Sequence, residues 1–454
     1  MKSLPYLIIG VFILGGINLP QQAFADTAAI EKRLGELEQE VAILKRQLEV
    51  QKEEVDKKAT ETLIVTASAK DGFSIKSLDD NFKLKIRGFV QADGRFFTDN
   101  QKDNSTTDTF TVRRARLIFD GTVGKIFDFY IAPDFGNGQS TLVDGYGEFR
   151  LAPAYKIRGG KFKAPLGLER LQSDAVSNFT EIGLPSNLLP NREIGFQLSG
   201  DVLKESVNYA VGAFNGSADL ASSNAQDADN NNDKDVLGRV FVQPFKNYGP
   251  EALKGLGLGV GGSYGHNEGA TTPTYKSAGQ ANIFSYTSTT SDGPHLRVSP
   301  QAYFYKGGLG LIGEYAVSEQ KVLRVSSGNI MRDSFSNTAW QVTGNYVWTG
   351  ELASYKGITP RTNFDLSKGT WGAFETVARY GHLNIDNSIF DNGFASLSTS
   401  VSEANEWGLG LNWYPHKNVR LSLDYLQTAF EGGAVSGGDR QTENAILSRF
   451  QVAY

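Results

Sequence analysis

Residues Phe82–Phe97 read FKLKIRGFVQADGRFF, and their side chains alternate between apolar and polar types. Phe82, Leu84, Ile86 and Val90 fall on one face, while lysine, arginine, glutamine and aspartate fall on the other. Successive side chains of a β-strand point to opposite faces of a sheet, so this period of two predicts a strand. One face of that strand suits an apolar medium and the other suits water.

The same alternation recurs to the end of the chain and predicts sixteen strands. They begin near Phe82, Phe110, Lys125, Leu142, Tyr155, Arg192, Ser206, Asp235, Leu256, His295, Leu309, Thr338, Trp371, Ala404, Asn418 and Thr442. An even number of strands is what a single-chain bacterial outer-membrane barrel requires. We therefore predict an all-β transmembrane barrel of sixteen antiparallel strands over residues 82–454.

The lengths of the connections support this count. Connections after odd-numbered strands are long and polar, as expected on the outer side of the membrane, and those after even-numbered strands are mostly tight turns. Residues 246–255 and 349–370 follow even-numbered strands but are longer, so each could hide a miscounted pair of strands.

The C-terminus, SRFQVAY, places Phe450, Val452 and Tyr454 on one face of the last strand. Outer-membrane barrels carry girdles of aromatic residues at the membrane interfaces, and a final aromatic residue is typical of them. The end of the chain therefore supports the barrel.

The N-terminus predicts export. Lys2 gives the positive start of a signal peptide, residues 7–14 (LIIGVFIL) its apolar centre, and residues 23–25 (AFA) its cleavage site. A retained membrane anchor is the alternative, but the apolar run is shorter than the roughly 20 residues that a helical span needs. We expect a cleaved signal peptide over residues 1–25 and an outer-membrane location.

Residues 26–58 carry apolar side chains at alternating steps of four and three, which predicts a coiled coil. These side chains are Ile30, Leu34, Leu37, Val41, Leu44, Leu48 and Val55, and the polar Gln51 occupies the slot between the last two. A single amphipathic helix packed on a globular core is the alternative, but the apolar stripe is narrow. Residues 59–81 are expected to form a polar linker between the coiled coil and the barrel.

The composition excludes several classes of protein. The 454 residues include no cysteine, so there are no disulfides and no thiol chemistry. The formal net charge of −5 argues against nucleic-acid binding, which usually needs a basic surplus. A mean hydropathy of −0.30 does not fit a helical membrane protein, but it fits a barrel in which lipid-facing and lumen-facing residues alternate.

Three motifs resemble the phosphate-selective porin O and P family. They are TVRRARL at residues 111–117, GGKFKAPLGLE at residues 159–169 and LPNREIGFQLSG at residues 189–200. The resemblance covers roughly residues 82–454 and includes the C-terminal strand. It implies a homotrimer of sixteen-stranded barrels, surrounded by outer-membrane lipid, that passes small anions such as phosphate or chloride by diffusion. Members of the family also carry a coiled coil before the barrel.

One departure from the family concerns the pore. Many members carry Glu-Arg where this chain has Glu181-Ile182, and no clear run of alternating arginines leads into the pore. The resemblance therefore implies anion transport, and this departure leaves the strictness of phosphate selectivity open.

The resemblance also implies that residues 164–191 fold into the lumen and narrow the pore. Lys161, Lys163, Arg170 and Arg192 lie in or beside this connection. Fixed positive charge in a narrow, partly desolvated passage attracts anions, which makes these residues selectivity candidates. The alternative is that they are solvated basic residues, balanced by neighbouring carboxylates.

Two further candidates lie on the second strand. Alternation places Arg114 and Arg116 on the lumen face, and it places Arg113 on the opposite face.

Other motifs predict no chemistry. The Asp- and Asn-rich residues 227–235 alternate oxygen side chains as calcium loops do, but they lack the central glycine and closing glutamate of an EF-hand, which favours a hydrated loop. Residues 255–265 (GLGLGVGGSYG) alternate like a strand and lack the lysine of a phosphate loop. No metal-binding histidine spacing or nucleophile motif is present. We expect no enzyme activity, no cofactor and no metal.

These observations predict a passive, anion-preferring porin. The alternative is a structural tether, in which the coiled coil links the outer membrane to the cell wall and the barrel serves mainly as an anchor.

Overall fold

The computed structural model describes residues 23–61, 63–68, 72–98, 106–222, 232–326, 328–435 and 437–454. The chain divides into two compact units, residues 1–63 and 64–454. The predicted signal peptide lies almost entirely outside the described residues.

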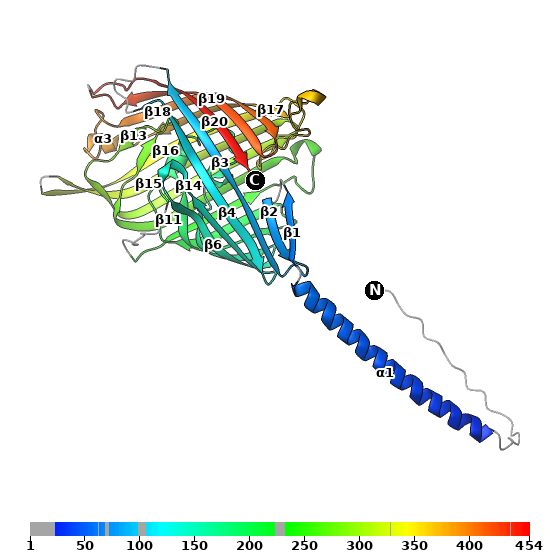
Figure 1. The fold of residues 1–454 in the computed structure, drawn as a ribbon. Coiled ribbons are helices and arrows are strands. Elements are labelled where there is room, and N and C mark those ends of the chain that lie inside the picture. Colours follow the sequence, from blue (N-terminus) through cyan, green and yellow to red (C-terminus); the bar gives the residue numbers. More distant parts are fainter. Residues whose placement is uncertain are drawn as a thin grey trace. The chain divides into compact units, whose positions relative to one another are not determined.

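The first unit contains one long helix, α1 (Ala23–Glu61), which confirms the predicted helix (Figure 1). The apolar stripe of this helix is exposed: Ile30 is 62% and Leu48 is 68% exposed. No helix among the described residues is both long enough and apolar enough to cross a membrane.

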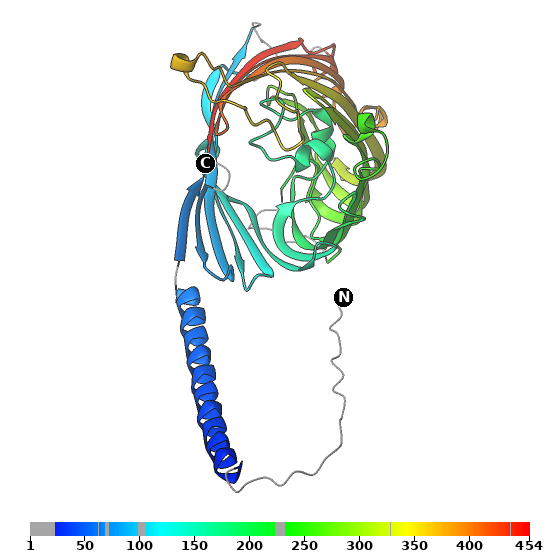
Figure 2. The same cartoon turned by 90° about the vertical axis from the view of Figure 1, so that its right-hand side faces the viewer.

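The second unit is a closed barrel of sixteen antiparallel strands, as predicted (Figures 1 and 2). Its strands are β3 (Phe82–Phe97), β4 (Thr109–Val123), β5 (Phe127–Asp134), β6 (Thr141–Ala152), β7 (Tyr155–Lys163), β8 (Arg192–Val202), β9 (Val207–Phe214), β10 (Asp235–Val242), β11 (Leu256–Thr271), β14 (Thr289–Lys306), β15 (Leu309–Ser326), β16 (Asn329–Val347), β17 (Ala373–Asn384), β18 (Val401–His416), β19 (Val419–Gly432) and β20 (Glu443–Ala453). Each strand pairs with its neighbours in sequence, and β20 pairs with β3 to close the ring.

Alternation along β18 shows why these residues form a barrel wall. Trp407, Leu409 and Leu411 are exposed on the outer face, whereas Glu406 and Asn412 are buried on the inner face. An apolar exterior around a polar interior lets the wall face lipid while the lumen holds polar groups.

The prediction that residues 59–81 form a polar linker is wrong for the second part of this range. Two short strands form there, β1 (Leu63–Ser68) and β2 (Gly72–Ser77). β1 pairs with β2. β2 pairs with the first part of β3, and the later part of β3 pairs with β20. Each strand is only six residues long, so the alternation was too short to predict them.

The long connection after β11 contains a second unpredicted feature, a small hairpin of β12 (Thr274–Lys276) and β13 (Asn282–Ser285). The two even connections that looked too long hide no strands in the described chain. They contain short 3₁₀ turns, η3 (Glu251–Leu253) and η4 (Leu366–Lys368).

Candidate functional site in the barrel lumen

The connection between β7 and β8, residues 164–191, lies inside the barrel, as expected (Figure 2). It contains a short helix, α2 (Leu168–Leu171), and a 3₁₀ turn, η2 (Leu184–Leu188). Leu168 and Phe179 are completely buried. Apolar side chains in this connection pack against the inner wall, which removes them from the water in the lumen. We call this segment the constriction loop.

Polar side chains of the wall hold the backbone of the constriction loop. The carboxylate of Glu314 on β15 accepts hydrogen bonds from the N–H groups of Leu168 (2.7 Å) and Glu169 (3.3 Å). Asp424 on β19 accepts from the N–H of Thr180 at 2.8 Å. Donors to loop carbonyls are Arg379 to Glu181 (2.9 Å), Arg420 to Ser177 (2.6 Å), Asn412 to Asn178 (2.9 Å) and Gln91 to Asp174 (2.8 Å). These bonds fix the loop to the wall from β15 round to β3.

The long connection between β16 and β17, residues 348–372, supports the loop as well. The hydroxyl of Tyr355 donates to the carbonyl of Leu168 at 2.6 Å, and Gln172 donates to the carbonyl of Tyr355 at 3.0 Å. An even-numbered connection that folds inward explains why this segment is longer than a turn.

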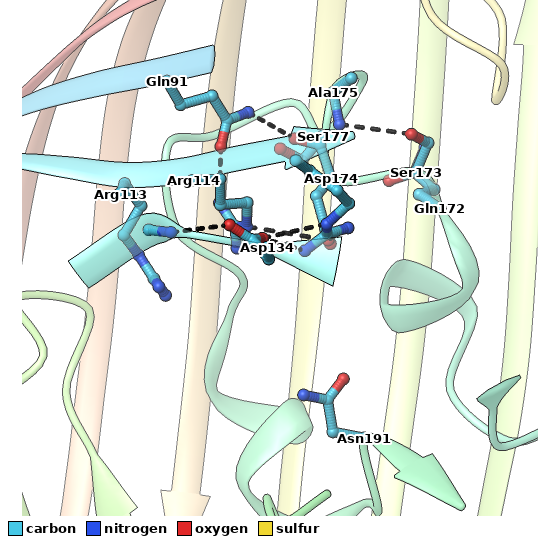
Figure 3. Close-up of polar contacts among 12 residues, drawn as sticks. Gln91, Arg113, Arg114, Asp134, Gln172, Ser173, Asp174, Ala175, Ser177 and Asn191 are labelled. Atoms are coloured by element: carbon cyan, nitrogen blue, oxygen red, sulfur yellow. Dashed lines mark hydrogen bonds and ion pairs between the residues drawn. The ribbon is translucent and has the colours of Figure 1, made fainter. Parts of the chain in front are cut away.

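The carboxylate of Asp174 lies among four basic side chains, of which Arg114 is labelled in Figure 3. Its Oδ2 atom is 2.7 Å from Nη1 of Arg116, 3.4 Å from Nη2 of Arg192 and 3.7 Å from Nε of Arg114. Its Oδ1 atom is 3.5 Å from Nζ of Lys163. Burial alone would raise the pKa of Asp174, but the four cations outweigh burial and hold this pKa well below its ordinary value. Asp174 is therefore ionised at neutral pH.

A second carboxylate of the loop, Glu181, binds two arginines. Nε of Arg113 lies 2.7 Å and Nη2 of Arg95 lies 3.0 Å from its Oε1 atom. Burial would raise the pKa of Glu181, but Arg113 in particular lowers it below the ordinary range. The loop thus brings two ionised carboxylates to the basic side of the wall.

The prediction that Arg113 faces away from the lumen is wrong. Gln91 on β3 pairs with Arg114, but the next residue, Ala92, pairs with Val112, so Arg113 is the extra residue of a β-bulge. A bulge interrupts the alternation of faces and re-aims a side chain. As a result, Arg113 and Arg114 both line the lumen.

Most of the predicted site residues meet in the structure. Lys163, Arg192, Arg114 and Arg116 gather around Asp174, as described above. Arg170 lies on α2, donates to the carbonyl of Ser186 at 2.6 Å, and has its pKa lowered to about 10 by burial, so it remains charged at neutral pH.

Lys161 precedes Phe162, which lines the lumen, but Lys161 itself lines neither of the two lumen cavities described next.

Two cavities meet at Asp174. The smaller, of about 160 Å³, extends towards the long connections and reaches Lys276, the last residue of β12. The larger, of about 490 Å³, extends towards the short turns and reaches Lys156 and Asn208. Ser173, Asp174 and Arg192 line both cavities. The Asp174 cluster therefore forms a narrow part of the lumen.

Basic residues outnumber acidic residues in these cavities by ten to five. The basic residues are Arg113, Arg114, Arg116, Lys156, Arg158, Lys163, Arg170, Arg192, Arg239 and Lys276, and the acidic residues are Asp144, Glu148, Glu169, Asp174 and Glu181. The whole chain carries a net charge of −5, so positive charge is concentrated at this point of the lumen. Sequence reasoning missed Arg95, Arg158 and Arg239, because only their position in the closed wall brings them here.

The remaining motifs add no site. Most of the Asp- and Asn-rich segment at residues 227–235 lies outside the described residues, and no group of metal-binding side chains occurs among the residues that the structure describes. Residues 256–265 lie on β11, as predicted for a strand.

Comparisons with known proteins agree with this architecture. The model of the phosphate-selective porin O and P family matches residues 82–454. Porin O of Pseudomonas aeruginosa is 22% identical to this chain over 425 residues, which cover 86% of this chain and 92% of that protein.

Two solved structures share the fold. The outer membrane channel DcaP of Acinetobacter baumannii has a TM-score of 0.54 at 13% identity, over 84% of this chain and 99% of that chain. The trimer form of OmpT, an outer membrane protein of Vibrio cholerae, has a TM-score of 0.50 at 12% identity, over 83% of this chain and 100% of that chain.

Proposed function

The chain belongs to the phosphate-selective porin O and P family and is an outer-membrane porin, and we propose that its pore prefers small anions, such as phosphate or chloride, over cations. The selectivity filter is the region where the constriction loop meets β4, β7 and β8. Solutes cross by diffusion, without a cofactor.

The excess of basic residues around the Asp174 cluster carries this proposal. A fixed charge acts more strongly on a mobile ion in a narrow, protein-lined passage than in open water, because the effective dielectric constant is lower. Ten basic and five acidic side chains line the two cavities, so entry lowers the electrostatic free energy of an anion and raises that of a cation. Arginine adds planar, two-pronged contacts that suit oxyanions such as phosphate.

The carboxylates of the constriction loop limit how tightly an anion binds. Asp174 already occupies the position between four basic groups that a bound anion would favour. A conducting pore must let an ion both enter and leave easily. Because Asp174 neutralises part of the positive charge of the cluster, an anion passes through instead of staying bound. This arrangement supports a general preference for small anions rather than strict selectivity for phosphate.

We further propose a homotrimer whose α1 helices form a coiled coil. The trimer form of OmpT has the same fold as this barrel. The exposed apolar side chains along α1, such as Leu34, Leu37 and Leu44, need a partner helix to be buried. A tether function through this helix has no comparable support.

A planar bilayer with a KCl gradient tests the anion preference. Purified porin is expected to give a reversal potential of the sign that marks chloride as the more permeant ion. A reversal potential of the opposite sign would contradict the proposed selectivity and leave the porin assignment intact.

A further inference from the structure

We propose that the larger cavity is a binding site for organic anions with a flat apolar body, such as aromatic carboxylates. This inference rests on the proposed function, because it assumes that anions pass through this cavity. A row of aromatic rings runs beside the basic residues of this cavity.

The row crosses neighbouring strands of the wall. Tyr130 on β5 stacks on Tyr146 on β6, with ring centroids 5.2 Å apart and planes within 5° of each other. Tyr146 meets Phe162 on β7 edge to face at 5.8 Å, and Phe162 meets Phe214 on β9 at 5.6 Å. The row is continuous across β8, because Gly195 has no side chain and a Cβ there would lie 2.7 Å from the ring of Phe214.

Part of this row is open to the lumen. Tyr130 and Tyr146 both line the larger cavity and are only partly buried. Within the described chain, the hydroxyls of Tyr130 and Tyr146 show no hydrogen-bond partner, so each can donate to a ligand. An aromatic face with a free donor at its edge suits a ligand that has both an apolar body and an anionic group.

Basic groups lie directly over two aromatic rings that line this cavity, one in the row and one outside it. The guanidinium carbon of Arg158 is 4.1 Å from the ring centroid of Tyr146, and that of Arg116 is 5.1 Å from the ring centroid of Phe89. Arg158 also pairs with Glu148 at 2.6 Å, which fixes its position over the ring. A carboxylate that binds such a guanidinium places its attached body against the aromatic surface.

Size and charge favour this ligand class over the alternatives. A cavity of about 490 Å³ lies within the range of small-molecule sites. An inorganic anion does not need aromatic walls. A neutral sugar would use the rings but gains nothing from the six basic side chains of this cavity, which face three acidic ones. The basic residues are Arg116, Lys156, Arg158, Lys163, Arg192 and Arg239, and the acidic residues are Asp144, Glu148 and Asp174.

Block of the chloride current in planar bilayers tests the site. Sodium benzoate, added to full-length porin, is expected to halve the current at a concentration about three- to ten-fold lower than sodium acetate, the factor that one aromatic contact supplies. Tyr130→Leu and Tyr146→Leu are expected to remove most of this difference and to leave the chloride reversal potential unchanged. Tyr264→Leu, on the exposed outer face, is the matched control and is expected to behave as wild type.

Three outcomes would overturn the inference: equal block by benzoate and acetate, block by neutral benzamide as strong as that by benzoate, or unchanged benzoate block in both tyrosine variants. Arg158→Lys, which keeps the charge but loses the planar group, gives a second test if a tyrosine variant does not fold. It is expected to weaken benzoate block more than acetate block. The two proposals are tested by different quantities. The reversal potential tests the proposed anion preference, which a cation-selective value would contradict, and the ratio of the blocking concentrations of benzoate and acetate tests the aromatic site.

Discussion

Replacing Asp174 with asparagine should make the constriction bind anions more tightly. Asparagine keeps the size of the side chain and one acceptor oxygen but removes the negative charge from the centre of the cluster. The four basic side chains around position 174 remain in place, since each belongs to the wall or to its junction with the constriction loop. Their charge then acts on a solute anion instead of on the protein's own carboxylate.

The size of the effect follows from the distance between the carboxylate and a passing anion. For an anion at a separation of about 6 Å from Asp174, the two unit charges repel each other by about 0.7–2.8 kcal/mol at effective dielectric constants between 80 and 20. Removing that repulsion corresponds to roughly 3- to 100-fold tighter anion binding at the constriction. The effect should decrease with rising salt concentration, because mobile ions screen the exposed part of the interaction.

Single-channel recording with phosphate titrated into a chloride solution measures this change. For Asp174→Asn, the phosphate concentration that halves the chloride current should fall by the stated factor, and the reversal potential in a KCl gradient should move further towards chloride. Asp292→Asn is the matched control: it removes the same charge from an aspartate that pairs with Arg332 and lines neither lumen cavity. If Asp174→Asn leaves both quantities at wild-type values, or moves the reversal potential towards potassium, Asp174 does not control anion entry.

Three further predictions concern the same region. Lys163→Glu should weaken the chloride preference, whereas Lys161→Glu, which lies outside the lumen cavities, should not, and equal shifts in the reversal potential would remove Lys163 from the filter. Protonation of Asp174 and Glu181 would raise the positive charge of the constriction, so anion preference should increase as pH falls. Because the pKa values of both carboxylates are depressed, neither should change the reversal potential between pH 7 and about pH 5, and a rise near pH 6 would contradict the ion pairs. Glu314→Ala leaves two buried loop N–H groups without an acceptor, at a cost of about 1–3 kcal/mol each, and should lower the melting temperature and increase open-channel noise. Glu314→Gln should retain part of the anchoring. Unchanged open-channel noise in the alanine variant would show that Glu314 does not hold the loop.

The barrel strands were predictable because lipid outside and water inside impose one alternating pattern on every strand. Each of the sixteen predicted strands corresponds to a barrel strand, but β14 and β16 begin at Thr289 and Asn329, earlier than the predicted starts at His295 and Thr338. The strands that were missed, β1, β2, β12 and β13, are three to six residues long, so alternation had too few positions in which to appear. Their structure depends on neighbours that are distant in sequence, as in the pairing of β2 with β3.

The candidate site was only partly predictable, for a different reason. Motif resemblance indicated the basic residues, but a sequence does not show where a bulge changes the face of a strand, and this error misplaced Arg113. It also does not show which acids and bases become partners across the lumen. The two interpretations of the basic cluster, a selectivity filter or residues balanced by carboxylates, proved not to exclude each other, because Asp174 and Glu181 pair with the same side chains that line the cavities.

That double role follows from the physics of placing arginines in a folded wall. A cluster of like charges inside protein repels itself and loses hydration, so Arg113, Arg114 and Arg116 need nearby carboxylates to be stable in these positions. The loop supplies the carboxylates, and its attachment to the wall from β15 round to β3 holds them there. In the proposed filter, the same carboxylates weaken anion binding, because an entering anion competes with them for the arginines. Stability of the constriction and rapid release of the solute therefore depend on the same ion pairs, and a variant that tightens anion binding at this point should also weaken the fold.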